Sequence, residues 1–393
     1  MSQCGIVNNG NECFINATLQ CLSVSPFIRN FIERYKKDDS FMIETLCKYG
    51  LSKFKAPDIK VECTKLIDLS KSDENIKFTP DEMQVLTKMS QYSSDVFIYI
   101  TFKEIIKCLM VKRGQLISTA KFLSITRDLV EGSDFEHLFS GEQNDPHEFM
   151  AFLLDKIHNS KSGKVNININ ANLDNVDSYS KLYLKHFKAR YENDYSYFVK
   201  NLYYYILNCI ECAKCGNKSY DVCPQDIMCI SIPEQMISAN VNITLDDCIK
   251  EMFKIESIEY KCEKCGNDKD NKMEKKLISK PKTLILKIKR YTAINQSLVK
   301  LNHMVNYPNI LYIQKYYCGI DQGNYSLYGV INHIGNISGG HYYSYIRNTV
   351  DKEDKYYNIW QACNDGDVKP IDESIAMMSR NAYILFYSDN IDD

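Results

Sequence analysis

The chain has 393 residues, of which 45% are hydrophobic and 25% charged, a composition typical of a globular protein with a substantial buried core. Its 48 basic residues are offset by 50 acidic ones, and a net charge of −2 argues against a general binder of nucleic acid or of anionic membranes. The sequence shows no signal-peptide pattern and no run of roughly 18 uncharged residues that would cross a membrane. We therefore expect an intracellular protein, in the cytoplasm or the nucleus.

The segment 5–20 predicts a loop that leads into a helix, because glycines and asparagines precede apolar residues at helical spacing. Cys13 lies at this junction, where unpaired backbone N–H groups and the helix dipole favour the thiolate, the nucleophilic form of cysteine. Asn8 could donate its amide to an oxyanion. A buried structural cysteine that opens an ordinary helix is the competing interpretation, and the segment alone does not decide between them.

Residues 27–135 predict a mainly helical region, because apolar residues recur every three or four positions. The piece 56–80 is polar and carries runs of charge, so we expect an insertion or a long loop there.

The segment 143–149 predicts the start of another helix, with Asp145 as the N-cap, Pro146 as the first helical residue and Glu148 as the capping-box partner. The pattern suits a well-capped core helix. A functional role for Gln143 and Asp145 remains the alternative.

Residues 161–208 are rich in tyrosine and lysine. Aromatic residues interleaved with lysines could stack on nucleobases. A helix or strand that packs its aromatic face on the core is the favoured interpretation, because the net charge is close to zero.

Sixteen cysteines suggest metal binding rather than a disulfide scaffold, because the chain is long and several cysteines have metal-type spacing. Two nearly identical C-x-K-C-G sequences, which we call the knuckles, contain Cys212 with Cys215 and Cys262 with Cys265. Four thiolates in two such turns can form a closed tetrahedral site, so we expect one structural zinc ion in a β extension. Cys209, three residues before Cys212, is a bystander or an alternative ligand.

The segments 284–291, 325–333 and 342–346 predict strands, because they are rich in β-branched and aromatic residues. The glycine-rich piece 335–340 predicts a hairpin connection, and His341 follows it where the chain re-enters the sheet. His341 is either a strand-edge histidine or a catalytic base.

Asn364 and Asp365 are expected to end a strand over 356–360. An ordinary Asn-Asp-Gly turn is the alternative. A last strand over 382–387 is expected to close the sheet.

A thiol, an imidazole and an Asn or Asp that orients the imidazole form the cysteine-protease arrangement. Residues 5–20 resemble the Cys box of the ubiquitin-specific proteases, and 325–345 with Asn364 and Asp365 resemble their His box. The segment 143–149 resembles the motif between the boxes, the two C-x-x-C pairs resemble the family's zinc-binding fingers, and 286–291 resembles the strand before the His box. The resemblance spans roughly residues 4–388 and is weakest over 27–135 and 161–208.

The resemblance implies an α+β fold of the papain-like cysteine proteases, with one catalytic domain over 1–393. Its parts would be a thumb (1–160, with an insertion near 56–80), a Tyr-rich insertion (161–208), zinc-bearing fingers (209–282) and a palm (283–393). The implied activity is hydrolysis of the bond after the C-terminal Gly-Gly of ubiquitin. The implied partners are ubiquitin and ubiquitinated proteins, with no role for membranes or nucleic acid.

Carried over by position, Cys13 would be the nucleophile, His341 the general base and later acid, Asn364 the residue that orients His341, and Asn8 an oxyanion donor. Asp365 would steady the oxyanion side through water. The residues that would line the channel for the ubiquitin tail are Gln143, Asp145, Gly339, Gly340 and Tyr342, and the zinc ligands would be Cys212, Cys215, Cys262 and Cys265. Glu12 departs from the family, which usually has a small or hydroxyl residue there, and a charge beside the nucleophile opposes thiolate formation.

Two other classes of function compete with an active hydrolase. One is a catalytically silent ubiquitin-binding module, which the presence of Cys13, His341 and Asn364 disfavours. The other is a zinc-ribbon protein that binds nucleic acid, which the near-zero net charge disfavours.

Overall fold

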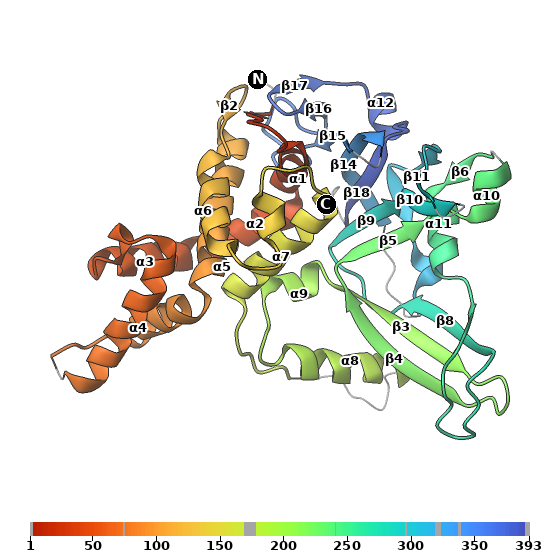
Figure 1. Cartoon of the computed structure of the whole chain (residues 1–393), viewed down its shortest axis with the longest axis horizontal. Coiled ribbons are helices and arrows are strands. Elements are labelled where there is room, and N and C mark those ends of the chain that lie inside the picture. The colour runs from red at the N-terminus through yellow and green to blue at the C-terminus, as the bar shows by residue number, and fades with distance from the viewer. Residues whose placement is uncertain are drawn as a thin grey trace. The chain divides into compact units, whose positions relative to one another are not determined.

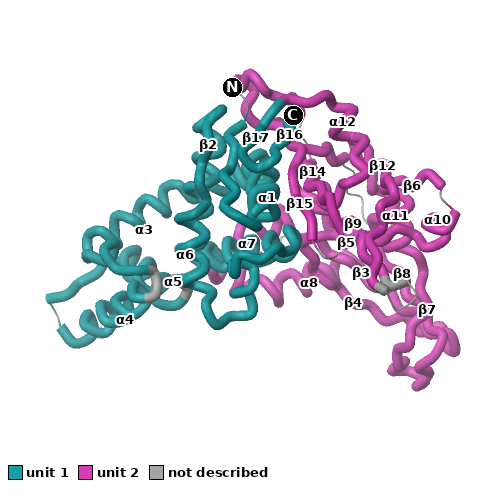
Figure 2. Tube along the Cα trace, turned by 45° about the horizontal axis from the view of Figure 1, so that its top comes forward, with its two compact units in different colours: residues 1–162, 361–369 teal, residues 163–360, 370–393 magenta. Residues whose placement is uncertain are grey.

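The computed structural model describes residues 3–73, 75–168, 178–239, 241–294, 297–318, 324–336 and 339–389. It divides into two compact units (Figure 2): unit 1 comprises Met1–Ser162 and Gln361–Lys369, and unit 2 comprises Gly163–Trp360 and Pro370–Asp393. The thumb, fingers and palm division stays a prediction. Among the described residues, every helix is too short or too polar to span a bilayer.

Unit 1 is mainly helical, as expected for 27–135 (Figure 1). Its helices are α1 (Cys13–Ser23), α2 (Pro26–Arg34), α3 (Lys36–Lys48), α4 (Ala56–Ser72), α5 (Pro80–Val111), α6 (Ala120–Val130) and α7 (Pro146–Lys161), with short 3₁₀ turns η1 (Leu51–Lys53) and η2 (Glu136–Phe139). Its strands are the parallel pair β1 (Gly5–Ile6) and β2 (Leu116–Ile117), and the neighbours β16 (Trp360–Asn364) and β17 (Asp367–Pro370).

The expected long loop over 56–80 is wrong, because α4 occupies most of that segment. Ile59 and Cys63 of α4 are buried in one cluster with Met42, Leu86 and Met89. Helix α4 therefore packs a narrow apolar face on this cluster, and its charged residues lie on the remaining faces.

Helix α7 has the expected N-cap residue but lacks the expected capping-box partner. The Asp145 carboxylate accepts the backbone N–H of His147 at 2.9 Å, which confirms Asp145 as the N-cap. Glu148 is not the capping-box partner, because its carboxylate lies 2.9 Å from Nε2 of His137 in η2. The carboxylate of Glu148 therefore contacts His137 instead of the backbone at the start of α7.

A buried ion cluster ties three helices of unit 1 together. The Asp39 carboxylate of α3, 1% exposed, accepts hydrogen bonds from Lys103 and Tyr99 of α5, both at 2.8 Å, and from Lys161 of α7. Burial alone raises the pKa of Asp39, but the charge of Lys161 and the hydrogen bonds of Lys103 and Lys161 outweigh it and hold the pKa below its usual value.

We expect Asp39→Asn to destabilise the protein by about 3 to 5 kcal/mol, because two buried ammonium groups lose their carboxylate. The exposed pair Glu33 and Lys36 supplies the control, and Glu33→Gln should change stability by less than about 1 kcal/mol. Since the pKa of Asp39 is lowered by folding, its contribution is present above the unfolded-state pKa and is lost as pH falls through the folded-state pKa. Urea unfolding at several pH values checks this, and equal stability of Asp39→Asn and the wild type near neutral pH would contradict it.

Unit 2 contains two sheets that differ in strand order. In the first sheet the described strands of unit 2 follow the order β15-β14-β18-β9-β5, with β13 on β14. These strands are β5 (Ile227–Ser231), β9 (Thr283–Lys289), β13 (Ile310–Tyr312), β14 (Asn324–Asn336), β15 (Gly339–Arg347) and β18 (Ala382–Asp389). The last strand, β18, was expected to close the sheet, but it lies between β14 and β9, where every residue of the strand before Asp389 is buried.

Smaller elements surround this first sheet. They are α10 (Glu234–Ala239), β6 (Ile243–Thr244), α11 (Leu245–Met252), the hairpin β10 (Tyr291–Ile294) and β11 (Ser297–Lys300), β12 (Val305–Asn306), η4 (Gln314–Tyr316) and α12 (Glu373–Met377). The range 209–282 therefore contains elements of both sheets, because β5 pairs with β9.

The second sheet has the order β4-β3-β8-β7 and carries the knuckles (Figure 1). Its strands are β3 (Tyr204–Glu211), β4 (Lys218–Gln225), β7 (Glu256–Ile258) and β8 (Asn271–Leu277). The helices α8 (Ser178–Tyr191) and α9 (Tyr197–Asn201) precede it. Aromatic residues of α8 pack on the sheet, as between Tyr183 and Tyr205, whose ring centroids are 4.9 Å apart, and this packing confirms the favoured interpretation of the Tyr-rich segment. Residues 169–177 of that segment lie outside the described residues.

Candidate active site and metal centre

Cys13 is the first residue of α1 and is 4% exposed. The first backbone hydrogen bond of the helix runs from Asn16 N to Glu12 O at 2.9 Å, so the N–H groups before Asn16 have no partner within the helix. The positive end of the helix dipole lies at the same place and favours an anion there. Cys13 therefore lies at the helix start where the sequence placed it, and its role as nucleophile stays a prediction.

The loop before Cys13 is organised by Asn8. Its Oδ1 accepts the backbone N–H groups of Gly10 at 3.0 Å and Glu12 at 3.3 Å, which makes a local turn around the side chain. Its Nδ2 donates to Oδ2 of Asp365 at 2.9 Å. An amide nitrogen carries two hydrogens, and among the described residues the bond to Asp365 accounts for one of them.

Asp365 joins the loop, the helix and the β16–β17 turn. Its second carboxylate oxygen, Oδ1, accepts Nδ2 of Asn16 at 2.8 Å, and its backbone carbonyl accepts the N–H of Ile6 at 3.0 Å. Asp365 has φ of 50°, a left-handed conformation that Asp and Asn adopt more readily than most residues. One carboxylate thus fixes two asparagines on either side of Cys13.

Asn16 is a residue of this site that sequence reasoning missed. It is 1% exposed on a helix whose other residues are also buried. Burying an amide without partners is unfavourable, so a polar residue three positions after the candidate nucleophile is a signal that a buried acceptor faces it.

The structure corrects the expected geometry of Asn364 and Asp365. The strand β16 begins at Trp360 and ends at Asn364, and residues 356–359 are not part of it. Asp365 is in the following turn, so the two side chains do not alternate across a strand. Asp365 also contacts Asn8 directly, whereas the resemblance implied support through water.

The chain passes very close to itself beside Asp365. A Cβ on Gly5 would lie 2.4 Å from the carbonyl oxygen of Gly366, so only glycine allows β1 to approach the turn. The two glycines at this approach therefore contribute to holding Asp365 beside Asn8.

Glu12 accepts hydrogen bonds from Asn9, through the backbone N–H at 3.3 Å and through Nδ2 at 3.4 Å. Its carboxylate makes these contacts within the loop. An effect of Glu12 on the thiol of Cys13 stays a prediction.

In unit 2, His341 lies on β15, paired with Ile334 of β14, and is half-buried. The expected hairpin is confirmed by the pairing of Asn336 with Gly339, although residues 337 and 338 lie outside the described residues. Tyr342 stacks on His333 of β14 with ring centroids 4.5 Å apart. His333 was not singled out from the sequence.

Gly340 is required by this packing. A Cβ at that position would lie 2.3 Å from Nε2 of His333 and 2.3 Å from the carbonyl oxygen of Ile334. Glycine at position 340 is therefore required by the packing of the sheet, independently of any substrate.

The candidate residues divide between the two units. Unit 1 holds Cys13, Asn8, Asn364, Asp365, Gln143 and Asp145, while unit 2 holds His341, Gly339, Gly340, Tyr342 and the four knuckle cysteines. Gln143 is exposed and Asp145 caps α7. The roles assigned to these residues stay predictions.

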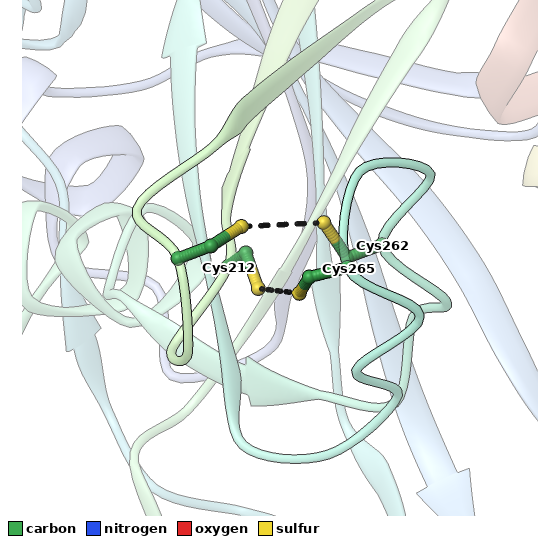
Figure 3. Close-up of side chains that lie close together, drawn as sticks. Cys212, Cys262 and Cys265 are labelled. Atoms are coloured by element: carbon green, nitrogen blue, oxygen red, sulfur yellow. Dashed lines mark hydrogen bonds between the residues drawn. The ribbon is translucent and has the colours of Figure 1, made fainter.

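The two knuckles bring four cysteine sulfurs together (Figure 3). Their Sγ atoms all lie within 4.8 Å of one another, with Cys212 and Cys265 at 3.5 Å and Cys215 and Cys262 at 3.7 Å. Zinc bound tetrahedrally at about 2.3 Å would place its sulfur ligands about 3.8 Å apart. The four cysteines therefore fit a closed zinc site.

The backbone of each knuckle has the same form. Gly216 N donates to Cys212 O at 2.9 Å and Gly266 N donates to Cys262 O at 2.8 Å, and both glycines have positive φ. In the first knuckle, backbone hydrogen bonds from Cys215 and Lys214 outweigh burial and hold the pKa of Cys212 below its usual value. In the second, a backbone hydrogen bond from Asn267 lowers the pKa of Cys265, but burial and the three neighbouring sulfurs outweigh it and raise that pKa. The thiols are therefore coupled, and metal binding requires that they lose their protons.

We expect one zinc ion per chain, bound by Cys212, Cys215, Cys262 and Cys265 and without a role in the chemical step, because four thiolates leave no open position. Metal analysis of the purified protein checks the stoichiometry. Cys212→Ser should release the ion and Cys209→Ser should retain it. The reverse pattern, or protein free of zinc, would reject this ligand set.

The structure is thus an α+β fold with a cysteine at the start of a buried helix and a separate cluster of four cysteines. The family model described as "Ubiquitin carboxyl-terminal hydrolase" matches residues 4–387. The chain therefore belongs to that family, and the resemblance of the Cys and His boxes is confirmed at the level of the family.

Relatives of known name agree with this assignment. The chain is 23% identical to ubiquitin carboxyl-terminal hydrolase 25 of Arabidopsis thaliana, covering 98% of this chain and 47% of that protein. It is 24% identical to the probable ubiquitin carboxyl-terminal hydrolase R319 of Acanthamoeba polyphaga mimivirus, covering 98% of this chain and 89% of that one. The chain thus spans about half the length of the plant relative and most of the viral one.

Solved structures confirm the fold. A structure titled as the SAGA Ubp8/Sgf11/Sus1/Sgf73 DUB module bound to ubiquitin aldehyde superposes with a TM-score of 0.62 and 18% identity, covering 99% of this chain and 70% of that one. A second structure of that module, bound to monoubiquitin, gives the same TM-score at 19% identity and covers 69% of that chain. The predicted fold class is therefore confirmed.

Proposed function

We propose that the chain is a thiol-dependent deubiquitinase that hydrolyses the isopeptide or peptide bond after the C-terminal Gly-Gly of ubiquitin. The observation that supports this most is the position of Cys13 at the start of a buried helix, flanked by Asn8 and Asn16, which share the carboxylate of Asp365. Family membership supplies the substrate class.

In the proposed reaction, His341 takes the proton of Cys13, and the thiolate attacks the carbonyl carbon of the terminal glycine of ubiquitin. His341 then donates the proton to the leaving amine, which leaves a thioester on Cys13. Water, deprotonated by His341, hydrolyses the thioester and restores the thiol. Asn364 would hold the imidazole tautomer by accepting its N–H.

Charge develops on the carbonyl oxygen during both attacks. The other N–H of Asn8 would donate to that oxygen, and a donor fixed in advance by Asp365 needs no reorganisation when the charge forms. Asp365 is therefore a positioning residue in this proposal.

Gln143, Asp145, Gly339, Gly340 and Tyr342 would line the channel for the extended tail of ubiquitin. Asp145 suits an arginine of that tail, because a carboxylate forms charge-assisted hydrogen bonds with a guanidinium group. The zinc-bearing sheet would contact the body of ubiquitin. The metal-type spacing of several cysteines in a long chain supports a reducing compartment, the cytoplasm or the nucleus.

Turnover of a fluorogenic amide at the ubiquitin C-terminus tests the activity, with the isopeptide bond of di-ubiquitin as the second substrate. We expect release of the fluorophore and of mono-ubiquitin. A protein that binds ubiquitin but releases neither would be the silent module.

A further inference from the structure

Asn271, the first residue of β8, lies between the two knuckles and is 1% exposed. Its Oδ1 accepts the backbone N–H of Ala213, inside the first knuckle, at 3.0 Å. The same oxygen accepts Nδ2 of Asn267, which directly follows the second knuckle, at 3.0 Å. Its Nδ2 donates to the carbonyl oxygen of Tyr260, which precedes the second knuckle, at 2.6 Å. One buried amide thus bonds to the first knuckle and to the residues on either side of the second.

The position of Asn271 explains why a side chain is needed there. The β3–β8 ladder ends where Glu211 pairs with Lys272. Cys212 follows Glu211 and leaves the ladder, and Asn271 precedes Lys272 on the partner strand. The amide of Asn271 therefore continues the hydrogen bonding between the strands beyond the last backbone pair, at the level of the sulfur cluster.

The two knuckles, although nearly identical in sequence, use their asparagines differently. Both continue as C-G-N, with Asn217 in the first and Asn267 in the second. The side chain of Asn267 donates to Asn271 and to the carbonyl of Lys269 at 2.8 Å. The backbone carbonyls of the two asparagines act alike, since Asn217 O accepts Cys212 N at 2.9 Å and Asn267 O accepts Cys262 N at 2.8 Å. No side-chain hydrogen bond of Asn217 is found among the described residues.

We propose that Asn271 is a positioning residue that holds the two knuckles in register before the metal binds, so that the four thiolates are assembled in advance. The amide reaches the metal only through the backbone of the knuckles, and it is not a ligand. Residues that orient metal ligands through hydrogen bonds typically change metal affinity by about 10- to 100-fold when they are removed. The proposal rests on the zinc assignment, which metal analysis of the wild type tests separately.

The test is a zinc competition titration against a chromophoric chelator, with the rate of chelator-driven zinc release as a second readout. We expect Asn271→Ala to bind zinc about 10- to 100-fold more weakly and to release it faster. Asn267→Ala removes one of the donors to Asn271 and should weaken zinc binding by a smaller factor. Asn217→Ala, at the matching position of the first knuckle, should leave zinc binding within about twofold of the wild type.

Near-UV circular dichroism, to which the tyrosines contribute, separates a local effect on the zinc site from unfolding of the protein. If Asn271→Ala fails to fold, the zinc affinity of Asn267→Ala still tests the proposal. Zinc affinity of Asn271→Ala equal to that of the wild type would overturn the proposal. An equal loss in Asn217→Ala and Asn267→Ala would overturn it as well, because the effect would then not depend on Asn271. Wild-type protein that binds no zinc would instead reject the metal assignment itself.

Discussion

Replacing Cys13 with alanine is expected to abolish hydrolysis, with kcat falling by about 10⁴- to 10⁶-fold, because no other group replaces the attacking sulfur. Binding of ubiquitin should be largely retained, since the change removes one atom from a helix that stays buried. Steady-state kinetics on a fluorogenic ubiquitin amide and a binding titration with ubiquitin measure the two effects separately.

Cys21 provides the matched control, because it is a second buried cysteine of α1 and is 0% exposed. Cys21→Ala should keep its activity, apart from a loss of stability due to the cavity. More than a trace of turnover in Cys13→Ala would contradict the mechanism, as would comparable losses in the two variants.

The second large effect is expected at Asp365. Asp365→Ala should lower kcat by about 10²- to 10³-fold, the usual effect of losing one oxyanion donor, because Asn8 and Asn16 lose the acceptor that fixes them. The KM should change little, because the donor acts only when charge develops. Kinetics on the same fluorogenic amide measure both constants.

Two further variants separate the positioning of Asn8 by Asp365 from two other effects, which are backbone strain at residue 365 and the role of Asn364. Asp365→Asn keeps a residue that tolerates the left-handed backbone, but it turns one acceptor into a donor that faces an amide, so we expect an intermediate loss. Asn364→Ala should also lower kcat with little change in KM, because the variant lacks the side chain proposed to orient the imidazole of His341. Asp365→Ala with wild-type kinetics would show that Asn8 is placed without the carboxylate.

Local patterns predicted the parts of the fold that depend on a few neighbouring residues. Asp145 followed by proline predicted the start of α7, and the repeated C-x-K-C-G sequence predicted that four sulfurs would meet. Each of these features depends on turn and cap geometry that the adjacent residues determine.

Patterns failed where a distant contact decided the outcome. Glu148 contacts His137 instead of capping its own helix. The segment of α4 was taken for a loop because its many charged residues mask the apolar residues on one face of the helix. The strand β18 is central because β9 and β14 both pair with it.

The candidate site shows the same division. Cys13 and Asn8 could be singled out because loop and helix signals surround them. The bond between Asn8 and Asp365 joins residues 357 positions apart, so the sequence alone offered only a bridging water. Asn16 was missed because it occupies a helical position where a core residue would also fit.

Covalent capture by ubiquitin that carries an electrophile in place of its C-terminal carboxylate tests the central claim most directly. The account predicts a single adduct of one ubiquitin per chain, with the modified peptide mapping to Cys13 and no adduct in Cys13→Ala. Capture at another of the sixteen cysteines, or a wild-type protein that binds ubiquitin without forming an adduct, would contradict it.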